Sequence, residues 1–136
     1  MKIILDCNVI ISAGLSDGNC RKVLFRVLQN HTLYVSKEIL IEYKAVISRP
    51  KFKGVYNYLY RLIENVCEIA ELIHPTKCKF VLPDRDDLIY LEAALSARAE
   101  FLITGNIKDF PCRKYQLTRI ITPKDFLDLE LETTCI

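Results

Sequence analysis

The sequence lacks the close-spaced cysteine and histidine pairs that hold structural zinc. Its six cysteines are scattered without a C-x-x-C pair, and only two histidines are present. Zinc sites usually combine two such pairs, so this pattern excludes one. Asp6 and Asn8 interrupt the apolar stretch that a secretion signal would need. We therefore expect a cytoplasmic protein whose cysteines are reduced thiols.

Long apolar runs and nucleotide-binding loops are also missing. No uninterrupted apolar run approaches the roughly 20 residues of a membrane span, so we expect no association with a membrane. Neither G-x-x-x-x-G-K nor G-x-G-x-x-G occurs in the sequence, which excludes the common phosphate-binding loops. The net charge is only +2, so any attraction to nucleic acid must come from a local basic patch.

Short apolar strands alternate with amphipathic helices along the 136 residues. This alternation favours an α/β fold with a parallel sheet flanked by helices. We expect one domain over residues 1–136, with a loose tail from about residue 130. Extended segments are expected at 3–5, 33–35, 80–82, 101–104 and 119–121. Helices are expected at 9–13, 19–28, 37–48, 55–72, 84–98 and 123–131, with one helical turn at 107–110.

Oxygen-bearing side chains recur just after the apolar strands and within two of the helices. They are Asp6, Glu42, Asp86, Asp87, Asn106 and Asp109. Because the carboxyl ends of parallel strands meet at one edge of a sheet, two strand ends and two helices can bring these groups to one crevice. Clustered carboxylates repel one another, and a hard cation such as Mg²⁺ or Mn²⁺ neutralises them. Such an ion activates water and holds a phosphodiester for attack.

Helix capping is the simpler explanation for several of these residues. Asp6 and Asn8 stand where a side-chain oxygen can accept from the free N–H groups of the next helix. Asp86 and Asp87 are favourable at the positive end of a helix, and Glu42 can be a solvated residue on a helix edge. The sequence pattern alone leaves both explanations open.

Four ordered motifs resemble those of the PIN-domain ribonuclease family. They are Leu5–Val9, Glu42 followed by Arg49–Phe52, Pro83–Asp87, and Leu102–Asn106. The segment Ile121–Leu127 is similar to the toxin branch of prokaryotic toxin–antitoxin pairs. The resemblance implies a three-layer α/β/α fold with a central parallel sheet and a Mg²⁺- or Mn²⁺-dependent endoribonuclease centre.

The resemblance also assigns roles by position. It implies that Asp6, Glu42 and Asp87 are the main acidic residues and the metal ligands. Supporting roles fall to Asn8, Ser12, Asp86, Thr104 and Asp109. Asn106 stands where many members of the branch carry aspartate, and an amide oxygen ligates without bringing charge. We expect Asn106 to be a site residue, Asp109 to be a possible substitute, and activity to be reduced.

An RNA substrate requires positive charge near the carboxylates. The candidates are Arg49, Lys51, Lys53, Arg85 and Lys108, although each also suits an ordinary solvated surface. The resemblance further implies single-stranded RNA as substrate, an antitoxin that covers the crevice, and a homodimer. Two alternatives stay open: a PIN-like domain that binds RNA or protein without cleavage, and a nuclease for DNA flaps or structured RNA.

Overall fold

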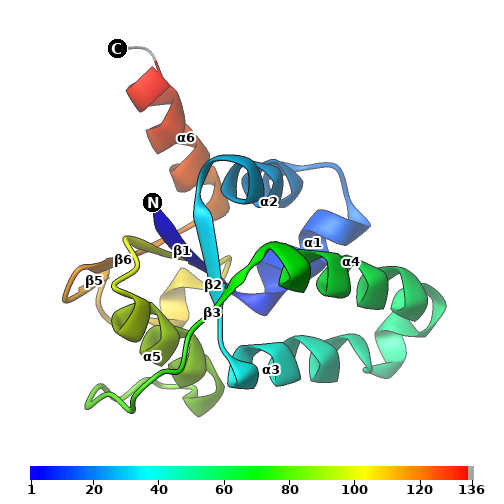
Figure 1. Cartoon of the computed structure of the whole chain (residues 1–136), viewed down its shortest axis with the longest axis horizontal. Helices are drawn as coiled ribbons and strands as arrows, with labels where there is room; N and C mark the ends of the chain where they lie inside the picture. The colour runs from blue at the N-terminus through cyan, green and yellow to red at the C-terminus, as the bar shows by residue number, and fades with distance from the viewer. Residues whose placement is uncertain (135–136) are drawn as a thin grey trace.

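The computed structural model describes residues 1–134, which form a six-stranded sheet with helices on both sides (Figure 1). The strand order is β3-β2-β1-β4-β6-β5. All neighbouring strands are parallel except β5 and β6. The strands are β1 (Lys2–Leu5), β2 (Thr32–Val35), β3 (Glu71–Leu72), β4 (Phe101–Ile103), β5 (Lys114–Tyr115) and β6 (Thr118–Ile121). The predicted α/β/α fold with its largely parallel central sheet is confirmed.

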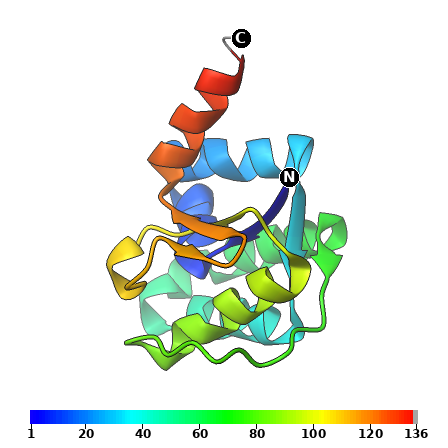
Figure 2. The ribbon, with the colours of Figure 1, turned by 90° about the vertical axis from the view of Figure 1, so that its left-hand side faces the viewer.

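The helices cover the sheet from two sides. They are α1 (Cys7–Leu15), α2 (Asn19–Asn30), α3 (Lys37–Ile47), α4 (Tyr56–Ile69), α5 (Leu88–Ala97) and α6 (Pro123–Thr134). Short 3₁₀ helices are η1 (Pro50–Val55), η2 (Arg85–Asp87) and η3 (Ile107–Asp109). Figure 2 shows α2 and α6 on one side of the strands, with α3 and α5 on the other. Within residues 1–134, no helix combines the length and apolarity needed to cross a membrane.

Two short strands were not expected from the sequence. Helix α4 ends at Ile69 rather than at residue 72, and β3 follows it at the sheet edge. The segment 80–82, which we expected to be extended, forms no strand. Strand β5 pairs with β6 through a tight hairpin. Two-residue strands are defined by their hydrogen-bonded neighbours, so they carry no apolar pattern of their own.

The last helix continues past the point where we expected a loose tail. Helix α6 runs to Thr134, and residues 135 and 136 lie outside the described part of the chain. Thr122 begins it, because its hydroxyl accepts from the backbone N–H of Asp125 at 3.2 Å. Glu130 lies 3.3 Å from the ring of His31 at the end of α2. This contact and the packing of α6 on α2 keep the helix regular beyond residue 130.

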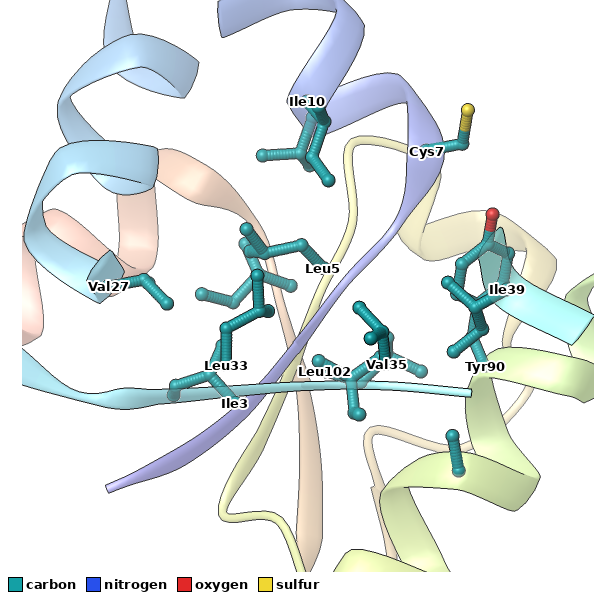
Figure 3. Packing of buried hydrophobic residues seen from close by; sticks show 14 of the residues in the cluster. Ile3, Leu5, Cys7, Ile10, Val27, Leu33, Val35, Ile39, Tyr90 and Leu102 are labelled. Carbon is teal, nitrogen blue, oxygen red and sulfur yellow. The ribbon is translucent and has the colours of Figure 1, made fainter. Parts of the chain in front are cut away.

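Strand β1 lies at the centre of the sheet, and its side chains are buried on both faces. Ile3, Ile4 and Leu5 are all 0% exposed, which explains why this strand is a continuous apolar run in the sequence. Figure 3 shows the strand side chains packed between Val27 of α2 and Tyr90 of α5. Burying the start of the chain in this way fixes the position of the residue that follows it.

The chain changes direction across the sheet between β1 and β4. From β1 it continues to β2 on one side, whereas from β4 it continues to β5 and β6 on the other. Leu5 pairs with Ile103 at the carboxyl end of both strands, and the N–H of Asp6 donates to the Ile103 carbonyl at 3.0 Å. The place where the strand order reverses in this way is called the switch point, and open α/β sheets bind their ligands there, at the carboxyl ends of the strands.

Tyr43 anchors the end of β1 from the α3 side. Its side chain is fully buried, and its hydroxyl donates to the Leu5 carbonyl at 2.6 Å. Helix α3 is itself started by Ser36, whose hydroxyl accepts from the N–H of Ile39 at 3.1 Å as the sequence predicted. The anchor therefore ties a well-capped helix to the strand end that precedes Asp6.

We expect Tyr43→Phe to lower the free energy of unfolding by about 1–2 kcal/mol, because the buried Leu5 carbonyl loses its donor. Urea denaturation measures this change. The control is Tyr58→Phe on α4, where the side chain is 55% exposed, and its effect should stay within about 0.5 kcal/mol. Equal stability of the Tyr43 variant and the wild type would show that this hydrogen bond adds nothing.

Candidate metal centre

A cavity of about 180 Å³ lies at the switch point, beyond the ends of β1 and β4. The predicted site residues that line it are Asp6, Asn8, Glu42, Asp86, Asp87, Asn106 and Asp109. Arg49, Asp84, Cys7, Val46 and Tyr90 complete the lining. A larger cavity, about 540 Å³, lies between residues 76–80 and the end of α5, but none of the predicted acids lines it. The acidic cavity thus gathers Asp6, which follows β1, with side chains from α1, α3, η2, α5 and η3.

Asp6 is held by a hydrogen bond across the two central strands. Its side chain is only 7% exposed, and its Oδ2 accepts from the Thr104 hydroxyl at 2.7 Å. The same hydroxyl accepts from the backbone N–H of Asn106 at 3.0 Å. Asp6 occupies the N-cap position of α1 without a side-chain capping hydrogen bond of regular geometry, and Asn8 lies inside that helix. The backbone N–H groups of Asn8 and Cys7 nevertheless lower the pKa of Asp6. Capping therefore contributes at Asp6, but it does not explain Asn8.

Capping does explain one neighbouring acid. Asp84 precedes η2, and its Oδ1 accepts from the backbone N–H of Asp86 at 2.9 Å. Asp86 and Asp87 belong to η2 and make no such cap. We expected both residues in the first turn of a helix that begins at residue 84. They instead form a 3₁₀ turn that precedes α5. Their carboxylates remain available to the cavity.

Asp87 carries a carboxylate oxygen without a partner. Its Oδ2 is buried and receives no hydrogen bond from any residue that the structure describes. Burial raises the pKa of Asp87 to about 7, and the charges of Asp6 and Asp109 add to the effect. A half-buried carboxylate with a raised pKa is more stable when it is protonated or binds a cation than when it carries an unneutralised negative charge.

The other two main acids are perturbed in the same direction. Burial raises the pKa of Asp6, although the hydrogen bond from Thr104 opposes this shift. Burial also raises the pKa of Glu42, with Asp86 adding to the shift and Arg49 opposing it. Three carboxylates from three different elements therefore share one environment that disfavours negative charge.

A hard divalent cation would relieve this arrangement by supplying charge and a partner for the Asp87 oxygen. Carboxylate oxygens are the donors that Mg²⁺ and Mn²⁺ prefer. Over residues 1–134, however, no three His, Cys, Asp or Glu side chains stand close enough to hold an ion together. Like charges repel, so carboxylates without a cation between them favour wide spacing. The donors therefore fit a cation in chemical kind, whereas their spacing is too wide to form a coordination shell.

Some predicted residues lie outside the cavity. Ser12 is exposed on α1, and Thr104 is fully buried behind Asp6. Of the basic candidates, Arg49 alone is in the lining. The others are exposed elsewhere on the surface: Lys51, Lys53, Arg85 and Lys108. Positive charge at the cavity therefore comes from the residue that follows α3.

Tyr90 and Cys7 are lining residues that sequence reasoning missed as members of the site. Burial raises the pKa of the Cys7 thiol to about 12, so it stays protonated and is no nucleophile. Burial also raises the pKa of Tyr90, which keeps its hydroxyl as a donor. In the sequence Tyr90 looks like another apolar residue of α5. Its spacing of three residues from Asp87 was the one available signal, because such pairs share a helix face.

We expect Asp87→Asn to stabilise the protein at neutral pH when chelator removes all metal. An unfolded aspartate ionises near its usual pKa of 3.8, whereas the folded one keeps its proton up to about pH 7. Stability therefore falls as pH rises from 4 to 7, since the unfolded chain releases the proton first. The asparagine removes this loss, worth about 1–2 kcal/mol after allowance for solvent screening.

Urea denaturation at about pH 4 and pH 7.5 measures the difference. The variant should gain on the wild type only at the higher pH. Asp17→Asn, at an exposed loop position, is the matched control and should show no such pH dependence. An Asp87 variant that loses stability at neutral pH would contradict the raised pKa.

Two solved structures are similar to this fold. VapBC2 from Rickettsia felis, bound to a DNA fragment from their promoter, gives a TM-score of 0.62 at 18% identity, covering 90% of this chain and 98% of that one. VapBC-1 from nontypeable Haemophilus influenzae gives a TM-score of 0.54 at 26% identity, covering 81% and 90%. No curated protein matches the sequence. A sequence model of the PIN domain matches residues 2–108. The chain therefore belongs to the PIN-domain family.

Proposed function

We propose that this protein is a Mg²⁺- or Mn²⁺-dependent endoribonuclease that cleaves single-stranded RNA. The observation that carries the proposal is the acidic cavity at the switch point, where Asp6, Glu42 and Asp87 all have raised pKa values. Membership of the PIN-domain family supports nuclease activity. The uncoordinated Asp87 oxygen supports a cation as the missing partner.

In this proposal, Asp6, Glu42 and Asp87 hold the cation. When bound, the ion would act as a Lewis acid that activates water and offsets the negative charge of the phosphate. Thr104 orients the Asp6 carboxylate through its hydrogen bond of 2.7 Å. Asn106 contributes an uncharged oxygen at the exposed rim of the cavity. Asp86 and Asp109 keep the site negative enough to attract a divalent ion.

Arg49 is the residue that we assign to the RNA phosphate. It is exposed, it lines the cavity, and its charge lowers the pKa of Glu42 against the effect of burial. A guanidinium at this position pairs with a phosphate oxygen and limits repulsion between the RNA and the carboxylates. Lys51 and Lys53 follow in η1 and extend the positive charge away from the cavity.

We further propose that the chain is the toxin of a toxin–antitoxin pair. The similarity of its fold to two VapBC structures supports this assignment and an antitoxin partner. A homodimer is the oligomeric state that we expect. Light scattering after size exclusion of the purified chain tests that state.

A second candidate function is a PIN-domain protein that binds RNA or a partner without cleaving it. Two observations favour this alternative. Asn106 brings no charge to the cavity, and the described residues hold no preformed set of three metal ligands. The two candidates differ in cleavage, so a cleavage assay separates them.

We expect the wild type to cleave labelled single-stranded RNA with Mn²⁺, and Asp6→Asn to be slower by about 100-fold or more, because a central ligand loses its charge. Asp17→Asn is again the matched control and should cleave at the wild-type rate. Chelator should abolish cleavage. Equal cleavage by wild type and Asp6→Asn, or cleavage by neither, would exclude the proposed centre.

We expect Asn106→Asp to bind Mn²⁺ about tenfold more tightly than the wild type, measured by calorimetry. One more negative charge beside a divalent ion at a partly exposed site is worth roughly 1–2 kcal/mol. Glu42→Gln removes a charge from the α3 side of the cavity and should weaken Mn²⁺ binding. An Asn106 variant with unchanged affinity would place this residue outside the metal centre.

A further inference from the structure

Two tyrosines stack beneath the turn that carries Asp6. Tyr43 of α3 and Tyr90 of α5 have ring centroids 6.5 Å apart with an interplanar angle of 30°. They are 0% and 3% exposed. The Tyr43 hydroxyl donates to the Leu5 carbonyl, whereas the Tyr90 hydroxyl finds no acceptor for its own proton among the described residues. The backbone N–H of Cys7 faces the Tyr90 oxygen and lowers the pKa of Tyr90 against the effect of burial. The same residue type therefore appears once with an acceptor for its hydroxyl proton and once without.

The Tyr90 hydroxyl lies close to the backbone of the turn that follows Asp6. Figure 3 shows it pointing toward the turn where Cys7 begins α1. Tyr90 lines the acidic cavity together with Asp6, the residue immediately before Cys7. Buried hydroxyls in folded proteins almost always have a partner, and leaving one unpaired lowers stability. A buried hydroxyl proton without an acceptor, on a residue that lines a ligand cavity, indicates that its acceptor is set in place with the ligand.

We propose that Tyr90 is a positioning residue of the metal centre, and that its hydroxyl donates to the Asp6 carboxylate when a cation is bound. This inference rests on the proposed function. Thr104 already donates to Asp6 Oδ2 from the β4 side, and the backbone N–H groups of Asn8 and Cys7 also favour the charged carboxylate. A second side-chain donor, from α5, would further restrict rotation of the carboxylate, and donors that orient metal ligands in this way raise metal affinity. Stacking on the anchored Tyr43 ring fixes the position of the donor.

The test compares Tyr90→Phe with Tyr43→Phe, because the two variants delete the same atom from two stacked rings. Without metal, Tyr90→Phe should keep or raise the unfolding temperature, since it removes a buried hydroxyl whose proton has no acceptor in the described part of the chain. Tyr43→Phe should lower that temperature. In calorimetric titration with Mn²⁺, Tyr90→Phe should bind about tenfold more weakly than the wild type. Tyr43→Phe, measured where it is fully folded, should stay within about twofold of the wild type.

For Tyr90→Phe we expect unchanged or higher stability together with weaker Mn²⁺ binding. A purely structural role would instead lower the stability, so the two measurements distinguish the roles. A lower unfolding temperature for metal-free Tyr90→Phe would overturn the inference, because the hydroxyl proton would then have an acceptor in the fold. Unchanged Mn²⁺ affinity in this variant, with weakened binding in Asp6→Asn, would also overturn it and leave the proposed metal centre intact. Failure of the wild type to bind Mn²⁺ would overturn both proposals.

Discussion

The hydrogen bond from Thr104 to Asp6 joins the two strand ends between which the chain changes direction. Its length is 2.7 Å, and both residues are buried. Because β1 and β4 are locked in register by parallel pairing, the hydroxyl and the carboxylate face each other without any loop flexibility. The Asp6 carboxylate therefore has a fixed position, and the other lining residues of the acidic cavity are arranged around it.

The buried carboxylates of the cavity lower the stability of the folded state, and the apolar core around them offsets this loss. Burial raises the pKa of Asp6, Glu42 and Asp87, so the folded state disfavours the charges that a metal centre requires. The core around β1 is apolar on both faces and supplies most of the compensating stability. A site of this kind exchanges stability for function, as active sites commonly do.

The sequence was most informative where the structure depends on local patterns. The buried strand before Asp6, the Ser36 cap and the proline start of α6 are all set by neighbouring residues. The convergence of Asp6, Glu42 and Asp87 followed from the topology of a parallel sheet and from the family resemblance. Strand β3 depends on a distant partner, β2, and β5 is a two-residue strand held by its hairpin to β6, so neither has an apolar pattern that predicts it. Tyr90 was missed for a similar reason, because burial makes a tyrosine resemble any apolar residue of its helix.

The absence of a carboxylate at position 106 has a counterpart within the same cavity. Asp109 lies three residues further, in η3, and lines the cavity with Asn106. Its charge raises the pKa of Asp87 and also that of Asp6. A group that acts electrostatically on both carboxylates is close enough to contribute to the same field. The β4 side of the cavity therefore keeps a negative charge, displaced by one helical turn. Since a hard cation responds to total charge and donor type more than to the position of one ligand, this displacement is compatible with a functional metal centre.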